Sequence, residues 1–419
     1  MRPPLLALAV LLTALVPATS HAEIPAACGA APAFHAGPLG AVAYIRSGML
    51  HVVDVSSRQD RALARISVPQ YGTRPLAWSA DGRWLSAGDL LIPAAGGRFC
   101  RPFAPGAGLY GGDADLDWAP HGDLLAATTA RGVFLLRPGG TPRRILPARW
   151  RADGFSPRGT RIAAQGPLQT NTPSLWAVDL AGGRRTLLYR APTLHVGAPV
   201  LARWTPDGRF VVFWTDSEDS VSIASDGLPL LAVPAGGGPA VPLAAHVLFT
   251  RQFVVPCGSG RVLVASGFDR YVSAHKSLEL FQEGSWSALD LSADPSHSWY
   301  DPSCAPDGSS ILATATLTPG DEDGKIDSSA RMVFLLAPDG ARRLLLGRPH
   351  NPVSYEGARF AKDGRHVLYL EHATRYGAPI RLRLLDLATG RSETVATMDG
   401  GQDYYGLHDL AGTAAWFEP

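Results

Sequence analysis

The 419-residue chain has few cysteines, few lysines and, beyond its first 22 residues, no long hydrophobic run. It contains four cysteines and no Cys-x-x-Cys pair, which argues against a structural zinc site. Lysine occurs only at Lys276, Lys325 and Lys362, and the formal net charge is +1. A general nucleic-acid binder carries a strong positive charge, so the sequence argues against nucleic acid as a partner.

Local catalytic motifs are also missing. The sequence has no P-loop, no Gly-x-Gly-x-x-Gly and no His-Glu-x-x-His. A nucleophile elbow needs Gly-x-Ser-x-Gly, and the nearest string, from Gly154 to Gly159, is one residue too long. These absences argue against the enzyme classes that these motifs mark, but they do not exclude an enzyme, because a propeller active site assembled from scattered blades leaves no local motif.

The N-terminus has the pattern of a secretory signal. Arg2 precedes an apolar run from Leu5 to Val16, and small residues stand at Ser20 and Ala22. The run is too short for a stable membrane anchor. We expect a signal peptide over residues 1–22 that is cleaved after Ala22, a periplasmic or secreted protein, and no transmembrane segment in the mature chain. An N-terminal arm over 23–37 and one domain over 38–419 follow.

A pattern of about ten residues recurs along that domain. It consists of an aromatic residue, a turn such as Pro-Asp-Gly, and an apolar strand, as in "WTPDGRFVVF" from Trp204. The turn glycines are spaced 37 to 56 residues apart and are Gly82, Gly122, Gly159, Gly208, Gly260, Gly308, Gly364 and Gly412. Repeats of this length with strand content are typical of propeller blades.

The repeat predicts an all-β fold, a single β-propeller of four-stranded blades. A third strand often ends in Asp-Leu, and an Arg-rich fourth strand follows it, as in 175–189. Eight copies predict eight blades, with seven as the alternative. The hairpin at 41–55 lacks the motif, and the last copy lacks its outer strands. We therefore expect N- and C-terminal strands to share one blade and close the ring, which removes free sheet edges.

These residues resemble the TolB-like propeller repeat, a relative of the WD repeat. The resemblance covers about residues 38 to 417 and lacks the separate N-terminal domain of TolB. It implies a periplasmic or cell-envelope protein as the binding partner, without naming it.

Two sets of candidate functional residues follow from the repeat. Inner-strand charges lie five or seven residues before a turn glycine and are expected to share a strand face near the central channel: Asp115, Asp117, Arg203, Asp301 and Arg359. Aromatic or His residues in the loops between blades are expected to ring the mouth of the channel as a binding face: Tyr71, Tyr110, Trp150, His195, Trp299, Tyr300, Tyr355, Tyr404 and Tyr405. The alternatives are structural ion pairs for the first set and inter-blade packing for the second.

The sequence predicts no cofactor, although one acidic loop could bind calcium. Asp321, Asp323 and Asp327 are spaced like ligands of a calcium loop, but positions 1 and 12 would be Pro319 and Ala330. A solvated acidic turn is the alternative interpretation.

The four cysteines predict two disulfides, as suits an exported protein. The copies at Gly260 and Gly308 have lost the packing aromatic, and each has gained a cysteine, Cys257 and Cys304. We expect these two to pair and join neighbouring blades. Cys28 would then pair with Cys100 and pin the N-terminal arm to the second blade.

We therefore expect a non-catalytic, exported propeller that works as a protein-binding module. One alternative is a propeller enzyme, a hydrolase or lyase acting on a small or saccharide substrate through the channel charges. Another is a carbohydrate or peptidoglycan binder.

Overall fold

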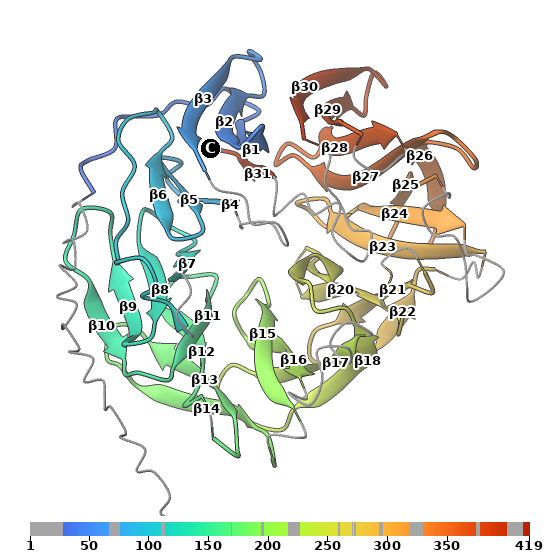
Figure 1. Cartoon of the computed structure of the whole chain (residues 1–419). Helices are drawn as coiled ribbons and strands as arrows, with labels where there is room; N and C mark the ends of the chain where they lie inside the picture. The colour runs from blue at the N-terminus through green and yellow to red at the C-terminus, as the bar shows by residue number, and fades with distance from the viewer. Residues whose placement is uncertain are drawn as a thin grey trace, which may run out of the picture.

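The computed structural model describes residues 28–66, 76–109, 114–168, 170–193, 197–216, 227–258, 260–269, 271, 274–292, 296–317, 330–373, 378–399 and 414–419. Over these residues the chain forms eight antiparallel sheets arranged as a ring (Figure 1). Seven of the described sheets have four strands and one has three. The all-β propeller is confirmed, with eight blades and not seven.

The blades are numbered here from the one that contains both chain ends. Blade 1 holds β31 (Ala414–Phe417), β1 (Ala41–Arg46), β2 (Met49–Asp54) and β3 (Asp60–Arg65). Blade 2 holds β4 (Leu76–Trp78), β5 (Trp84–Ala87) and β6 (Leu90–Pro93). Blade 3 holds β7 (Asp115–Trp118), β8 (Leu125–Thr129), β9 (Gly132–Leu136) and β10 (Arg143–Leu146). Blade 4 holds β11 (Arg151–Phe155), β12 (Arg161–Gln165), β13 (Ser174–Asp179) and β14 (Arg185–Arg190).

The second half of the ring has the same order. Blade 5 holds β15 (Ala198–Trp204), β16 (Phe210–Asp216), β17 (Leu228–Pro234) and β18 (Val241–Val247). A short 3-10 turn, η3 (Arg251–Phe253), leads into blade 6, with β19 (Val254–Pro256), β20 (Arg261–Ser266), β21 (Ser277–Gln282) and β22 (Ala288–Asp290). Blade 7 holds β23 (His297–Cys304), β24 (Ile311–Leu317), β25 (Met332–Leu336) and β26 (Arg342–Leu346). Blade 8 holds β27 (Val353–Phe360), β28 (His366–Ala373), β29 (Ile380–Asp386) and β30 (Ser392–Met398).

Both ends of the chain build blade 1, as predicted. The C-terminal strand β31 pairs antiparallel with β1, from Ala41↔Phe417 to Tyr44↔Ala414 (Figure 1). The indole N–H of Trp416 donates to the carbonyl of Leu39 at 2.9 Å. The N-terminal segment supplies three strands and not only the expected hairpin, because β3 adds to the outer side of β2.

Inner-strand tryptophans tie neighbouring blades together. The indole N–H of Trp78 on β4 donates to the carbonyl of Ala415 on β31 at 2.9 Å. Trp118 on β7 donates to Ser86 Oγ on β5 at 3.0 Å, and Trp204 on β15 donates to the carbonyl of Gly154 on β11 at 3.2 Å. Each bond reaches the preceding blade, so the recurring aromatic of the sequence motif is an inter-blade contact.

The turn after each inner strand explains the recurring Asp-Gly pair. In blade 2 the Asp81 carboxylate accepts from Ser79 Oγ at 2.6 Å and from the backbone N–H of Arg83 at 3.1 Å. Gly82 follows with φ +69°, a left-handed conformation that favours glycine. A Cβ at Gly82 would also meet the ring of Phe417 at 2.3 Å, so this turn and the closing strand fit closely.

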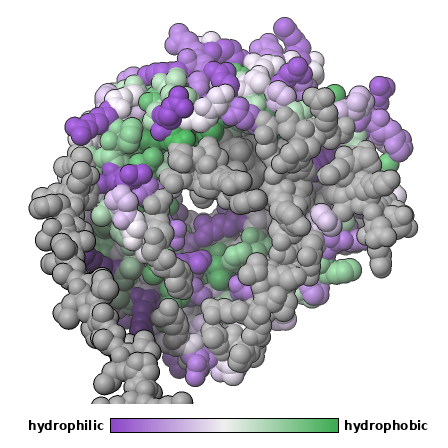
Figure 2. All heavy atoms as spheres, in the orientation of Figure 1, coloured by the Kyte–Doolittle hydropathy of each residue, from purple (hydrophilic) through white to green (hydrophobic). Residues whose placement is uncertain are grey.

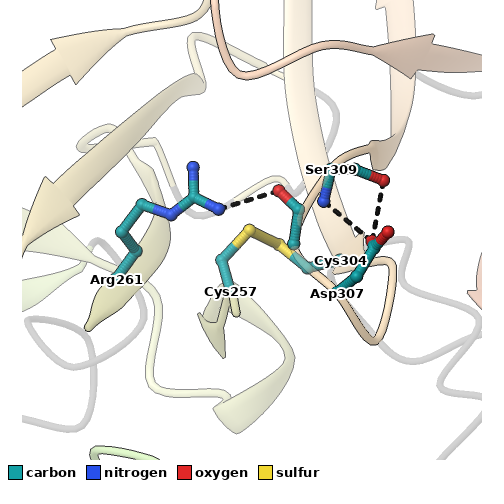
Figure 3. Close-up of a disulfide and its surroundings, with 6 residues drawn as sticks. Cys257, Arg261, Cys304, Asp307 and Ser309 are labelled. Atoms are coloured by element: carbon teal, nitrogen blue, oxygen red, sulfur yellow. Dashed lines mark hydrogen bonds between the residues drawn. A yellow bond between two sulfur atoms is a disulfide. The ribbon is translucent and has the colours of Figure 1, made fainter. Parts of the chain in front are cut away.

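Both predicted disulfides are confirmed. Cys257 follows β19 and bonds Cys304 at the end of β23, with their Cα atoms 5.2 Å apart, so blades 6 and 7 are covalently joined (Figure 3). Beside this bond the Arg261 guanidinium donates to the carbonyl of Gly308 in the turn of blade 7 at 2.8 Å. The same turn is held by the Asp307 carboxylate, which accepts from the Ser309 backbone N–H at 2.9 Å.

The second disulfide fixes the start of the described chain to blade 2. Cys28 bonds Cys100 with a Cα–Cα distance of 5.3 Å. Cys100 meets Leu91 in an isolated bridge, where a fourth strand would otherwise run in this three-stranded blade. The Arg83 guanidinium holds the same arm by donating to the carbonyl of Ala31 at 2.7 Å. The predicted signal peptide lies outside the described residues, and among the described residues no helix is long and apolar enough to span a membrane.

Candidate functional site at the channel and the loop face

β-Bulges interrupt several inner strands and redirect their side chains. The register shifts between Ala152 and Gly154 in β11, between Leu201 and Arg203 in β15, and within 300–303 and 356–359 of β23 and β27. Each bulge inserts an extra residue before the position five back from the turn glycine. The expectation that positions five and seven share one face is therefore wrong for these strands, although it holds in β7, which pairs without a shift.

Two of the five predicted charges form an ion pair. The Arg359 guanidinium on β27 contacts the Asp301 carboxylate on β23 and also reaches the Asp301 carbonyl at 3.5 Å. Asp301 sits in the bulge with φ +49°, which is rare for a residue other than glycine. Burial raises the pKa of Asp301, while Arg359 opposes that shift. The bulge thus aims an otherwise buried carboxylate at the neighbouring blade.

The predicted acidic residues of blade 3 lie near charges of blade 4 and of the 3-10 turn before blade 6. Burial raises the pKa of Asp115 on β7, and Arg151 of β11 opposes the shift. Burial also raises the pKa of Asp117, against the attraction of Arg251. Asp153, which the sequence reasoning missed, lies in the β11 bulge and accepts from Arg151 Nε at 2.8 Å.

Arg203, the remaining predicted charge, is held by backbone carbonyls. Its Nε donates to the carbonyl of Val254 at 2.7 Å and its Nη2 to the carbonyl of Arg251 at 3.1 Å. Burial lowers the pKa of Arg203 to about 10, and the nearby guanidiniums of Arg251 and Arg359 add to this. The structure therefore brings Asp117 and Arg203 close to Arg251, and Arg359, which pairs with Asp301, also lies near Arg203.

A cavity of about 320 Å³ opens among these side chains. Figure 2 shows an opening near the centre of the ring, with hydrophilic residues along part of its rim. The cavity is lined by inner-strand and turn residues of blades 3 to 6, among them Asp117, Asp153, Arg203, Arg251, Trp118 and Trp204. Two residues in this lining, Asp153 and Arg251, carried no signal in the sequence because a bulge and a 3-10 turn place them there.

The predicted aromatic ring is largely a packing feature where it is described. Trp150, Trp299 and Tyr300 are buried, so these three do not present a contact surface. Trp299 packs edge-on against Phe334 of β25 at 4.9 Å between ring centroids, and Trp150 packs against Trp176 of β13. Tyr355 is half-buried. The other predicted residues lie outside the described part of the chain: Tyr71, Tyr110, His195, Tyr404 and Tyr405.

A different set of aromatic residues is exposed on two loops, one leading from blade 5 to blade 6 and one between β20 and β21 within blade 6. Phe249, after β18, is 45% exposed, and Phe268 and Tyr271, after β20, are 64% and 39% exposed. Phe268 stacks on His275 and packs edge-on against His246, each at 6.3 Å between ring centroids. This set is called the loop cluster below. The sequence reasoning missed it because aromatic residues in loops give no signal of whether they are exposed.

The loop that carries Phe268 and Tyr271 is held in place by polar contacts. The backbone N–H of Gly267 donates to the carbonyl of His246 at 2.8 Å and so joins this loop to strand β18. The Asp269 carboxylate accepts from the Tyr271 backbone N–H at 2.9 Å and lies 3.3 Å from His275 Nδ1. The rings are therefore presented by a braced backbone.

The calcium expectation has no test in the structure, because Asp321, Asp323 and Asp327 lie outside the described residues. Among the residues that are described, no group of three or more His, Cys, Asp or Glu side chains is placed to hold a metal ion.

Comparisons with known proteins support the fold. Neither a scan against protein-family models nor a search of curated proteins found a match. Among solved structures, dihydro-heme d1 dehydrogenase NirN in complex with DHE is 16% identical, with a TM-score of 0.55 over 89% of this chain and 76% of that chain. Dipeptidyl peptidase 4 of Porphyromonas gingivalis is 9% identical, with a TM-score of 0.56 over 86% of this chain and 59% of its own.

The solved neighbours also include TolB from Acinetobacter baumannii, at 17% identity and a TM-score of 0.34 over 69% of this chain and 64% of that chain. That superposition is too loose to carry an argument. At 16% and 9% identity, the dehydrogenase and the peptidase show the propeller fold alone.

Proposed function

We propose that this chain is an exported, TolB-like propeller that binds a periplasmic or cell-envelope protein through the loop cluster. The observation that carries the proposal is Phe268, a large apolar side chain that is 64% exposed between two histidine rings. Leaving such a ring in water forgoes the free energy that its burial would release. Neighbouring aromatic anchors of this kind are typical of protein-binding surfaces.

The composition of the cluster favours a protein partner. Phenylalanine and tyrosine bury a large area for little loss of side-chain entropy, and the histidines and Asp269 add polar contacts at the edge. The hydrogen bond from Gly267 to His246 already orders part of the loop backbone, so binding costs less conformational entropy.

Two other features agree with an exported protein. Both disulfides join parts of the chain that are distant in sequence, with separations of 72 and 47 residues. Disulfides persist in oxidising compartments and are rare in the reducing cytosol. The proposed signal peptide over residues 1–22 is consistent with this location.

The test is capture from a periplasmic extract with the wild-type protein and a Phe268→Ala/Tyr271→Ala variant. We expect a protein recovered in stoichiometric amounts by the wild type, and binding weakened by roughly 30-fold or more in the variant, as for the loss of an interface anchor. Phe99→Ala is the matched control, because Phe99 is 45% exposed but lies in blade 2. It should leave capture unchanged.

Three results would contradict the proposal. One is equal capture by the wild type and the loop-cluster variant. Another is turnover in a hydrolase or lyase screen together with no captured protein, which would favour the propeller enzyme. The third is retention on peptidoglycan or another polysaccharide in place of a protein.

A further inference from the structure

Arg203 in the channel is a partly buried cation without an acidic partner among the described residues. Its two hydrogen bonds go to the backbone carbonyls of Val254 and Arg251. Carbonyl oxygens satisfy N–H groups but carry no formal negative charge. Charged side chains that leave bulk water are usually paired, so the Arg203 site is incomplete in its charge balance.

A second guanidinium deepens that imbalance. Arg251 donates through Nη2 to the carbonyl of Asp153, and no carboxylate within the described residues forms an ion pair with it. Arg251 and Arg359 both act to lower the pKa of Arg203, which places positive charges close enough to repel. Like charges near one another cost free energy, which an anion between them would recover.

The cavity beside these two arginines has an apolar wall. Its volume of about 320 Å³ is at the lower end of the range for small-molecule sites. Indole, phenyl and pyrrolidine rings line it together with the guanidiniums: Trp118, Trp204, Phe155, Pro120, Pro157, Pro206 and Pro256. An inorganic anion would make no favourable contact with the apolar rings. An organic acid with an apolar body can contact both the guanidiniums and the rings.

We propose that this cavity binds the carboxylate of an organic acid between Arg203 and Arg251, with the apolar part of the ligand against the tryptophan and proline rings. The N–H groups of both guanidiniums that are not used by backbone carbonyls donate to the carboxylate oxygens. The carboxylate belongs either to a free small acid or to the C-terminus of a peptide, since the recognised chemistry is the same.

The two acids in the lining do not cancel this preference. Asp153 is already bonded to Arg151 Nε at 2.8 Å. Burial raises the pKa of Asp117, so its neutral form persists to higher pH than for an exposed aspartate.

The experiment is calorimetric titration of the full-length mature protein with 3-phenylpropionate and with its amide, 3-phenylpropionamide, which has the same apolar body. We expect the acid to bind at least about tenfold more tightly than the amide, as charge-assisted hydrogen bonds require. Arg203→Gln and Arg251→Gln should each weaken binding of the acid by about tenfold or more. Arg209→Gln, an exposed arginine on the turn of blade 5, is the matched control and should bind the acid like the wild type.

A second pair of probes separates the two sources of the carboxylate. These are an N-acetylated dipeptide ending in phenylalanine with a free C-terminus, and the same peptide as its C-terminal amide. Binding of the free-carboxylate peptide alone supports the peptide source, and binding of 3-phenylpropionate supports the small acid. Thermal melts of each variant check that the fold is kept, and Arg251→Gln tests the site if Arg203→Gln fails to fold.

The proposal is overturned if each carboxylate probe binds no more tightly than its own amide, if neither carboxylate probe binds, or if only inorganic phosphate binds. It is also overturned if the arginine variants bind the acid as tightly as the wild type. The Phe268→Ala/Tyr271→Ala variant should bind 3-phenylpropionate normally. The carboxylate site and the loop cluster therefore succeed or fail separately.

Discussion

Opening the disulfide between Cys257 and Cys304 should lower the free energy of unfolding by about 4 kcal/mol. The bond closes a 47-residue loop, and in the chain-entropy model releasing a loop of that length restores about 14 cal/mol/K to the unfolded chain. If residues 38–419 unfold as one unit, an unfolding entropy of about 2.1 cal/mol/K per residue gives about 0.8 kcal/mol/K. The melting temperature should then fall by about 5 °C.

The assay compares the oxidised and reduced forms of one amino-acid sequence. In a Cys28→Ala/Cys100→Ala background the remaining bond is Cys257–Cys304. Guanidinium unfolding with and without reductant then measures that bond alone, without the packing loss that would follow from replacing the buried Cys257. The reciprocal background measures Cys28–Cys100, whose 72-residue loop should contribute about 0.4 kcal/mol more in the same model.

A change below about 1 kcal/mol for Cys257–Cys304 would refute the loop-entropy reasoning for this bond. It would mean that blades 6 and 7 stay associated in the unfolded ensemble, or that they are held by other contacts. The reasoning would also be refuted if opening Cys257–Cys304, which closes the shorter loop, lowered the free energy of unfolding much more than opening Cys28–Cys100.

Deleting residues 414–419 removes β31 and should lower the melting temperature of the whole protein, because β1 and β4 both lose their contacts with it. A single cooperative circular-dichroism melt within a degree or two of the wild type would contradict the closure of the ring. Trp78→Phe removes the N–H bond to Ala415 and should cost about 1 kcal/mol in denaturant unfolding, and no change would assign that contact to packing alone. A bidentate bond from Arg365 lowers the folded-state pKa of Asp386, so its stabilisation is present above the unfolded value of 3.8 and is lost as pH falls below it. Asp386→Asn should therefore flatten the acid limb of a stability–pH curve below about pH 4, and an unchanged limb would contradict the assignment.

The ring, its closure and the Cys257–Cys304 disulfide were predictable because they are properties of a repeat, and Cys28–Cys100 then followed as the remaining pair. Eight copies of one turn give eight blades, and the loss of the packing aromatic in two neighbouring copies points to Cys257 and Cys304. Such inferences need only the identity and spacing of residues along the chain, and these can be read directly from the sequence.

The candidate site was less predictable because it depends on where side chains point. The bulges of β11, β15, β23 and β27 each add one residue to an inner strand and so break the simple alternation of faces. Asp153 enters the cavity through the β11 bulge, and Arg251 enters it from the 3-10 turn before β19. Burial was equally hard to infer: Trp299 and Phe268 are both aromatic residues near blade ends, yet one is enclosed and the other is exposed.

The closing strand also governs when the protein can complete its fold. The bond from Trp416 to Leu39 joins residues 377 positions apart, so the first blade cannot be finished until almost the whole chain has been synthesised. Until then β1 presents an open edge, which is the kind of surface that pairs with other chains. Contacts between residues so far apart in sequence form slowly. Until β31 pairs with β1, the partly folded chain is susceptible to aggregation and proteolysis. A ring closed in this way therefore makes an incomplete chain unstable as a whole.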